Sequence, residues 1–292
     1  MNPYEASPEK IPATDRYVLE PLYGRYSPRP DDFVPNKCHI NSTSPESLKY
    51  WASVLERCDV FIRIYENIDD EGRDVFALGS VIVKSTHLKE KLEGKKVHRD
   101  YSLADMNEVR ATALARSVLT NIKIPEIYFA GKIEGRDVLI QERIPGVGLN
   151  VAWQYLSQAQ KESFKLQARN LLHRLQEIQP PSTQTHRSYL VPDPDPVEHR
   201  GIQTLEMDII FGADNRNPDL SFMHNDLSPS NIIVDNDRIV GLVDWEMAGC
   251  FGWDTAGIVH VQIRSPKKEN FAALELSQEL LDDIMFWNNL YD

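Results

Sequence analysis

The stretch from Phe222 to Gly249, FMHNDLSPSNIIVDNDRIVGLVDWEMAG, decides how this chain is interpreted. It places two short apolar runs, IIVD and IVGLVD, on either side of a turn, which indicates two adjoining strands. His224, Asp226 and Asn231 precede the first run, and Asp244 ends the second. Because a strand, a turn and a returning strand would bring Asp244 back beside Asn231, the pattern predicts a cluster of oxygen ligands.

The residue types in this cluster suit phosphate chemistry. A carboxylate and an amide are suitable ligands for Mg²⁺, which takes few protein ligands and leaves room for phosphate oxygens and water. Asp226 would face the same space with its carboxylate free to orient a hydroxyl, which is the division of labour that phosphoryl transfer from ATP requires. An Asx-rich turn between two strands is the plain alternative, but a spaced motif of several residues rarely assembles by chance.

Composition sets broad limits on the protein class. With 292 residues, 41% hydrophobic and 26% charged, the chain is typical of a soluble globular protein with one large domain or two lobes. The net charge of −12 and the pI near 5.2 argue against nucleic-acid binding, which needs a basic face. An acidic surface is common for solubility alone, and it would also suit a cationic substrate.

Cysteine usage and the termini point to a cytoplasmic location. Cys38, Cys58 and Cys250 are far apart and odd in number, which favours free thiols in a reducing compartment. The N-terminal residues contain no basic region followed by an apolar run, so we expect no signal peptide. No apolar stretch approaches membrane-spanning length, and we expect no membrane association.

The pattern of the rest of the chain predicts an α+β protein with two lobes and a cleft between them. We expect an extended arm over residues 1–50, a small antiparallel sheet with one helix over 51–144, and a mainly helical lobe over 145–292. The expected elements are a helix over 44–58 capped by Ser44, a strand over 59–67, strands joined at Gly79-Ser80, a helix opened by Ser102 and Asp105 as a capping box, strands joined at Glu134-Gly135, a helix with a Ser157–Gln160 capping box that ends at Pro180, and helical stretches near 276–291.

The segment His224–Trp245 resembles the signature of the aminoglycoside phosphotransferase and choline kinase-like family, which has a protein-kinase-like fold. The family pattern is close to H-G-D-L-H-P-G-N-I-L-V-D, followed by a strand that ends in D-W or D-F. The matching positions are His224, Asp226, Leu227, Pro229, Asn231, Asp235, Asp244 and Trp245. Asn225 and Ser230 replace the two usual glycines, and Ser228 replaces the second histidine.

The resemblance implies roles for the residues of the motif. Asp226 would be the catalytic aspartate that accepts or orients the substrate hydroxyl, while Asn231 and Asp244 would bind Mg²⁺. His224 would hold the loop and the metal-binding segment together. Asp254, in GWDTAG, would receive backbone N–H groups from the catalytic loop, although a simple N-cap aspartate explains it equally well.

The resemblance extends upstream, to roughly Val60. VIVK is similar to the strand that carries the phosphate-binding lysine, which nominates Lys84 for the α- and β-phosphates and Ile82 for the space under the adenine. Glu108 would pair with Lys84, with Asp105 and Glu90 as alternative partners. VLIQERIPG resembles the linker between lobes, where backbone groups from Gln141 to Ile144, among them those of Glu142 and Ile144, would bind the adenine edge.

The acceptor is predicted to be a small molecule rather than a protein. A protein kinase would show a G-x-G-x-x-G loop, a lysine at the position of Ser228, and a long activation segment after Asp244. We therefore expect ATP (or GTP) and Mg²⁺ as cofactors, with a hydroxyl-bearing small molecule as acceptor. An amine-bearing acceptor is a further hypothesis. The candidate acids for the wall of its binding site are Glu246, Asp208, Glu206, Asp282 and Asp283. The rival class is a catalytically silent nucleotide-binding protein or scaffold on the same fold.

Overall fold

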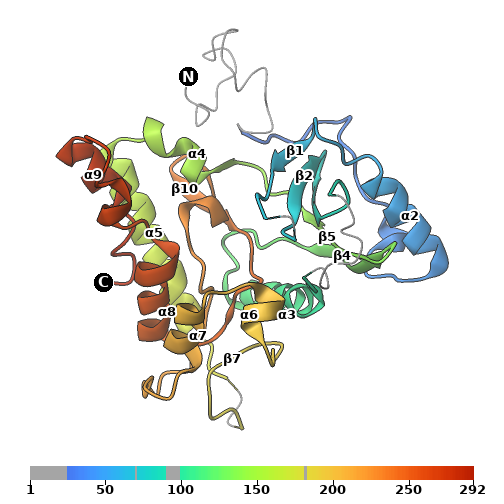
Figure 1. Cartoon of the computed structure of the whole chain (residues 1–292). Helices are drawn as coiled ribbons and strands as arrows, with labels where there is room; N and C mark the ends of the chain where they lie inside the picture. Colours follow the sequence, from blue (N-terminus) through green and yellow to red (C-terminus); the bar gives the residue numbers. More distant parts are fainter. Residues whose placement is uncertain (1–24, 70, 90–98, 181–182) are drawn as a thin grey trace.

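The computed structural model describes residues 25–69, 71–89, 99–180 and 183–292. A small lobe carries an antiparallel sheet, a larger lobe is mostly helical, and the helix α3 (Ser102–Val118) lies between them (Figure 1). The α+β, two-lobed fold class expected from the sequence is confirmed by this arrangement.

The small lobe is built on five strands in the order β1-β2-β3-β5-β4. Their bounds are β1 (Arg63–Tyr65), β2 (Asp74–Leu78), β3 (Val81–Ser85), β4 (Ile127–Ile133) and β5 (Arg136–Glu142). Both predicted turns are present, and Gly79, Glu134 and Gly135 have the positive φ angles that tight hairpin turns require. The strand expected over 59–67 is only three residues long, because Asp59 accepts the Phe61 N–H and folds the chain into a turn.

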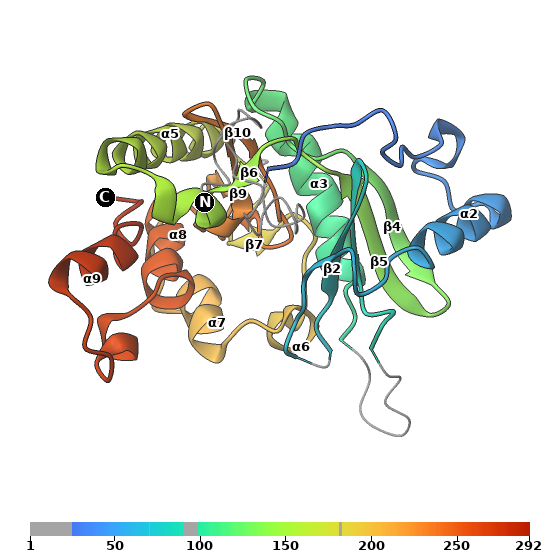
Figure 2. The ribbon, with the colours of Figure 1, turned by 90° about the horizontal axis from the view of Figure 1, so that it is seen from above.

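One helix covers each face of this sheet (Figure 2). The helix α2 (Pro45–Leu55) begins where predicted, with the Ser44 hydroxyl accepting the Ser47 N–H at 3.2 Å. Trp51 of α2 packs on the outer face with Val81 and Val83 of β3. The opposite face of the sheet meets α3, which buries Ala111 and Ala115 in the core of the larger lobe. The helix α3 therefore connects the two lobes.

The predicted capping box at the start of α3 is wrong. The N-cap is Tyr101, which makes no side-chain capping bond, and the Ser102 N–H donates to the Asp100 carboxylate instead. The Asp105 carboxylate points into the protein and pairs with Arg73 at 2.6 Å. A buried carboxylate with an arginine available gains more from that pair than from an exposed backbone N–H.

The larger lobe is organised around α5 (Gln158–Gln176), whose Ser157–Gln160 capping box is present as predicted. Phe164, Ala168, Leu172 and Leu175 of α5 form the centre of the core. The other elements are β6 (Val147–Gly148), α4 (Leu149–Ala152), η3 (Trp153–Tyr155), β7 (Ser188–Tyr189), α6 (Pro196–Arg200), α7 (Thr204–Phe211), β8 (Phe222–Met223), η4 (Pro229–Asn231), β9 (Ile232–Asp235), β10 (Arg238–Leu242), β11 (Gly249–Cys250), α8 (Trp253–Val259), the π-helical turn η5 (His260–Arg264), η6 (Lys268–Phe271) and α9 (Gln278–Ile284).

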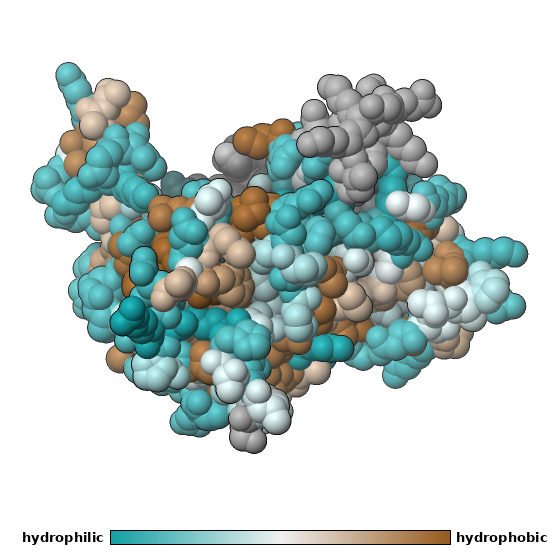
Figure 3. All heavy atoms as spheres, turned by 60° about the horizontal axis from the view of Figure 1, so that its bottom comes forward, coloured by the Kyte–Doolittle hydropathy of each residue, from teal (hydrophilic) through white to brown (hydrophobic). Residues whose placement is uncertain are grey.

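The described part of the expected N-terminal arm contacts both lobes. It contains η2 (Lys37–His39), the Tyr26 N–H donates to the Gly146 carbonyl at 2.8 Å, and the Asn41 N–H donates to Tyr128 at 2.9 Å. Residues 1–24 of that arm lie outside the described residues. The face in Figure 3 is mainly hydrophilic, with small apolar patches. Within the described chain, no helix combines the length and the apolar character needed to cross a membrane.

Candidate active site

The hairpin of β9 and β10 positions the central acid. Its turn at Asn236-Asp237 has φ angles of 46° and 59°, and Leu242 pairs with Ile232 across the strands. The pairing continues one step further, because the Val243 N–H donates to the Asn231 carbonyl at 3.0 Å. Asp244 therefore follows directly beside Asn231, as the sequence predicts. Asp244 itself has a φ of 65°, a left-handed backbone that is uncommon for aspartate and that often occurs at functional sites.

The loop before β9 is tied to the same hairpin by two side chains. The Asn231 Nδ2 donates to the Asp226 carbonyl at 2.8 Å, which turns the amide oxygen away from that bond. His224 is fully buried and its Nε2 donates to the Val243 carbonyl at 3.1 Å. The His224 ring also packs on Trp245, with 4.4 Å between the ring centroids. Asp226 and Asp244 are thus held on one rigid unit.

The three departures from the family pattern have a local explanation. Asn225 has a φ of 63°, the left-handed conformation that glycine adopts freely and asparagine tolerates better than most residues. Ser228 and Ser230 bond to each other through their hydroxyls at 2.7 Å, on either side of the first residue of η4. The loop therefore keeps a turn without the two glycines.

On the sheet side of Asp244 lies the lysine predicted from VIVK. The Lys84 ammonium contacts Glu108 at 2.9 Å and Asp244 at 2.7 Å. Burial raises the pKa of Glu108, against the opposing charge of Lys84. Burial also acts to raise the pKa of Asp244, but Lys84 holds that pKa below its usual value. Of the alternative partners considered for Lys84, Asp105 pairs with Arg73 instead, and Glu90 lies outside the described residues.

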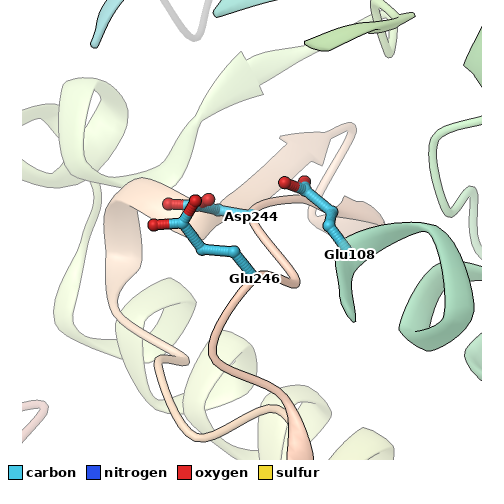
Figure 4. A group of neighbouring side chains, drawn as sticks. All are labelled: Glu108, Asp244 and Glu246. Carbon is cyan, nitrogen blue, oxygen red and sulfur yellow. The ribbon is translucent and has the colours of Figure 1, made fainter. Parts of the chain in front are cut away.

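Three carboxylates come together at this point. Oxygen atoms of Glu108, Asp244 and Glu246 lie within 4.8 Å of one another. Figure 4 shows the Asp244 and Glu246 carboxylates side by side, while Glu108 reaches toward them from α3. The sequence interpretation assigned Glu246 to the acceptor wall and missed it as a member of this cluster. The available signal was its position two residues after Asp244, in Asp-Trp-Glu, with Trp245 turned into the core.

Asp226 faces a different environment from Asp244. Burial raises the pKa of Asp226 to about 7, while the Arg264 guanidinium opposes that rise. The Arg264 Nε lies 3.4 Å from the Asp226 Oδ1, and its Nη2 donates to Glu206, which is fully buried in α7. Arg264 belongs to the π-helical turn η5, a feature common at functional sites. No sequence motif pointed to Arg264.

Some of the backbone N–H groups proposed to bind the adenine edge already donate to carbonyls of the protein. The Glu142 N–H donates to the Glu126 carbonyl at 2.8 Å, and its side chain binds Lys123 at 2.9 Å. The Arg143 N–H donates to the Ser80 carbonyl at 2.9 Å. Since these amides already have partners, the next backbone amide, that of Ile144, is the better candidate for a purine. Ile82, on the same face of β3 as Lys84, is half-buried and available to pack under a base.

The role considered for Asp254 is wrong in both of its forms. Asp254 is exposed, accepts a hydrogen bond from Asn217 at 2.7 Å, and is not the N-cap of α8, which is Gly252. The carboxylate that binds the start of α8 is that of Asp219, which accepts the N–H groups of Trp253 at 2.8 Å and of Ser221 at 2.9 Å. The sequence signal for Asp219 was an Asp-x-Ser turn, Asp219-Leu220-Ser221, directly before β8.

The acids suggested for an acceptor wall separate into two groups. Glu206 and Glu246 are close enough to Asp226 to contribute to its raised pKa, after burial as the main cause. Asp208 is exposed, Asp283 pairs with Lys161 at 2.6 Å, and Asp282 accepts from Gln278. Two of the five acids, Glu206 and Glu246, therefore lie near Asp226.

Comparison with known proteins identifies a family. The model of the phosphotransferase enzyme family (APH) matches residues 91–273. No curated protein matches the sequence.

Solved structures that match this chain have low sequence identity to it. The streptomycin-ATP ternary complex of APH(2″)-IIa is 12% identical, with a TM-score of 0.46, over 85% of this chain and 82% of that one. Macrolide 2′-phosphotransferase MphH from Brachybacterium faecium is 13% identical, with a TM-score of 0.43, over 76% and 78%. The amicoumacin kinase hAmiN is 11% identical, with a TM-score of 0.44, over 85% and 77%.

Proposed function

The chain belongs to the phosphotransferase enzyme family, whose members phosphorylate small molecules, and from this premise we propose that it transfers the terminal phosphate of ATP or GTP to a hydroxyl group with the help of Mg²⁺. The observation that carries the proposal is the position of Asp244, which lies between the Lys84–Glu108 ion pair on one side and the Asp226 loop on the other.

The residues around Asp244 fit a divalent metal ion. Four carboxylates, those of Asp105, Glu108, Asp244 and Glu246, are held by only two cations, Lys84 and Arg73. If all six groups are ionised, the excess of negative charge equals that of one Mg²⁺. Asp244 and Glu246 would hold the ion, with the Asn231 amide oxygen as a third ligand. Bound there, the ion would neutralise charge on the phosphates.

The remaining residues have separate tasks in this proposal. Asp226, with a pKa near 7, is suited to accept the proton of an acceptor hydroxyl at neutral pH. Lys84, kept charged and oriented by Glu108, would bind the α- and β-phosphates. Ile82 and the Ile144 amide would bind the base. His224 would keep Asp226 at a fixed distance from the metal site through its bond to Val243.

Thermal-shift and turnover measurements test this function. We expect ATP or GTP to stabilise the wild-type protein only when Mg²⁺ is present, and we expect phosphate transfer to at least one member of a panel of amino alcohols, aminoglycosides and sugars. Mg²⁺-dependent stabilisation without turnover on a broad panel would favour the catalytically silent alternative. No stabilisation by any nucleotide would contradict both.

An amine-bearing acceptor is the narrower form of the proposal. The acids Glu206 and Glu246 near Asp226 support it, because an ammonium group would be attracted to them. Arg264 opposes it, because its guanidinium already pairs with Glu206 and lies next to Asp226. If only neutral or anionic members of the panel are phosphorylated, the amine hypothesis is excluded while phosphotransfer stands.

A further inference from the structure

Two cations of the sheet lobe repeat the same arrangement. Each joins one acid of α3 to one acid of the segment that carries Asp244. Lys84 does so with Glu108 and Asp244, and Arg73 does so with Asp105 at 2.6 Å and Glu246 at 3.1 Å. Asp105 and Glu108 are one turn apart on α3, so the two sets lie next to each other. The proposed function gives a phosphate contact to Lys84 and none to Arg73.

The Arg73 set differs from an ion pair that serves only to stabilise the fold. Its contact with Asp105 uses a single oxygen, and the other oxygen, Oδ2, is buried with no hydrogen-bond partner among residues 25–69, 71–89, 99–180 and 183–292. A purely structural pair would gain from the bidentate geometry that arginine offers. Arg73 is fixed from a third side by Tyr101, whose ring centre lies 4.0 Å from the guanidinium carbon.

Of its partners, Glu246 is the one that Arg73 can exchange. The Glu246 side chain is 19% exposed and belongs to the acid cluster with Asp244, whereas the Asp105 side chain is 4% exposed. A metal ion held by Asp244 and Glu246 would draw the Glu246 charge to itself. That would free one edge of the Arg73 guanidinium while Asp105 and Tyr101 keep it in place.

The order of residues along β3 and β2 indicates what the freed edge of the Arg73 guanidinium would meet. Val81 of β3 pairs with Glu142 at the linker end of the sheet, and Lys84 lies three residues further along β3. Lys84 pairs with Val75, and Arg73 lies two residues before Val75, just ahead of the start of β2 at Asp74. The Arg73 side chain reaches an acid of α3, as that of Lys84 does. A nucleotide that extends from the linker past Ile82 to Lys84 therefore reaches Arg73 as the next cation.

We propose that Arg73 is a second phosphate-binding residue of the nucleotide site, which contacts the terminal phosphate when the metal takes Glu246. This inference rests on the proposed function. It assigns the α- and β-phosphates to Lys84 and the γ-phosphate to Arg73. A charge-assisted hydrogen bond to the γ-phosphate would make the protein distinguish triphosphates from diphosphates.

Calorimetric titration with Mg²⁺ and either AMP-PNP or ADP tests the assignment without any acceptor. For Arg73→Met we expect the affinity for Mg·AMP-PNP to fall about tenfold or more, and the affinity for Mg·ADP to change by less than about threefold. The matched control is Arg63→Met, which removes an arginine of the same sheet that pairs with Asp74 and Glu66. This control should leave both affinities unchanged.

Each other outcome decides against the inference. Equal losses for AMP-PNP and ADP would make Arg73 a structural link between the lobes, and no loss for either would remove it from the site. Arg73→Lys keeps the charge and is the variant to use if Arg73→Met does not fold. It should retain part of the wild-type preference for Mg·AMP-PNP over Mg·ADP. Its loss of affinity for Mg·AMP-PNP should be smaller than that of Arg73→Met, and smaller than the loss of affinity for Mg·ADP in Lys84→Met. If the wild-type protein binds neither nucleotide, the proposed function fails, and this inference fails with it.

Discussion

The two sides of Asp244 differ in how completely their charges are paired. On the nucleotide side, Lys84 and Arg73 each lie between two carboxylates, at distances from 2.6 to 3.1 Å. On the acceptor side, Asp226 has a single cation, Arg264, at 3.4 Å, and the buried Glu206 Oε2 has no hydrogen-bond partner in the described chain. Buried polar groups are normally satisfied. Apart from the Asp105 Oδ2, which is unpartnered within the described residues, the charges of the nucleotide side are therefore paired in advance, whereas we expect the acceptor side to be completed by its substrate.

The largest expected effect comes from removing the acid between the two sides. In Asp244→Asn, we expect Mg²⁺-dependent stabilisation by nucleotide to disappear and turnover to fall by about 10³ or more, because the metal loses its central carboxylate. Thermal shift and a coupled turnover assay measure the two effects. Asp235→Asn, an acid of the same hairpin that pairs with Arg25, is the control and should keep both properties. If the two variants behave alike, Asp244 is not a metal ligand.

A substitution at Asp226 should lower turnover without weakening nucleotide binding. In Asp226→Asn, we expect the Mg²⁺-dependent thermal shift to stay within error of the wild type, while turnover falls by about 10² to 10⁴, the usual range for losing a general base. The reason is that Asp226 contacts the nucleotide side only through its carbonyl, which accepts from Asn231 and is retained in the variant. A variant that loses nucleotide binding as well would place Asp226 on the nucleotide side and erase the contrast between the two sides.

The sequence predicted the nucleotide side far better than the acceptor side, and the reason is physical. Lys84 and Glu108 lie on regular elements, whose periodicity fixes which side chains share a face, and Asp244 follows two residues after β10. Arg264, Glu206 and Asp219 are brought to their partners by irregular turns between elements far apart in the chain. No local pattern encodes such contacts. Asp254 was misassigned for the same reason, since the aspartate that accepts the first N–H of α8 is Asp219, 34 residues earlier in the chain, and only the folded chain brings it there.

His224 links the two sides, and its burial predicts a pH-dependent stability. Burial lowers the pKa of His224 from 6.5 to about 4. The unfolded chain therefore takes up this proton between about pH 6.5 and 4, whereas the folded protein resists it. The contribution of His224 is complete above pH 6.5 and is lost as the pH falls toward 4, by on the order of 3 kcal/mol. Urea unfolding of wild type and His224→Gln at pH 7.5, 6 and 5 would measure it. Parallel pH dependence in the two proteins would contradict the assignment.

A smaller effect is expected on the acceptor side, at Arg264. In Arg264→Met we expect turnover to fall about tenfold with nucleotide affinity unchanged, because Asp226 loses the only ion pair that it makes within the described residues. The effect is modest because the two groups are 3.4 Å apart, a long distance for such a contact. Glu206→Gln should have a smaller effect in the same direction, since Arg264 would lose its anchor. The control is Arg187→Met, which removes an arginine of the same lobe that bonds to the carbonyls of Asn215 and Asn217. Equal losses in Arg264→Met and Arg187→Met would indicate general destabilisation.

The smallest expected effect concerns Asn225, next to Asp226, and here two opposing terms decide the sign. Both polar atoms of the Asn225 side chain are buried with no hydrogen-bond partner in the part of the chain that the structure describes. In Asn225→Gly the buried amide is removed, which favours the folded state by about 1 kcal/mol. The greater freedom of glycine in the unfolded chain costs about 0.4 to 1 kcal/mol. We therefore expect a net change within about 0.5 kcal/mol.

Asn225→Ala removes the same amide but keeps a Cβ at a φ of 63°, which costs about 1 to 2 kcal/mol. Alanine should therefore be the less stable of the two variants in urea unfolding. If glycine instead destabilises the protein by more than about 1 kcal/mol, the Asn225 amide must have a partner that these side chains do not supply, such as bound water. Asn225 would then be hydrogen-bonded, as the charged groups of the nucleotide side are paired. The acceptor side would in that case have fewer unpartnered polar groups than its contacts indicate.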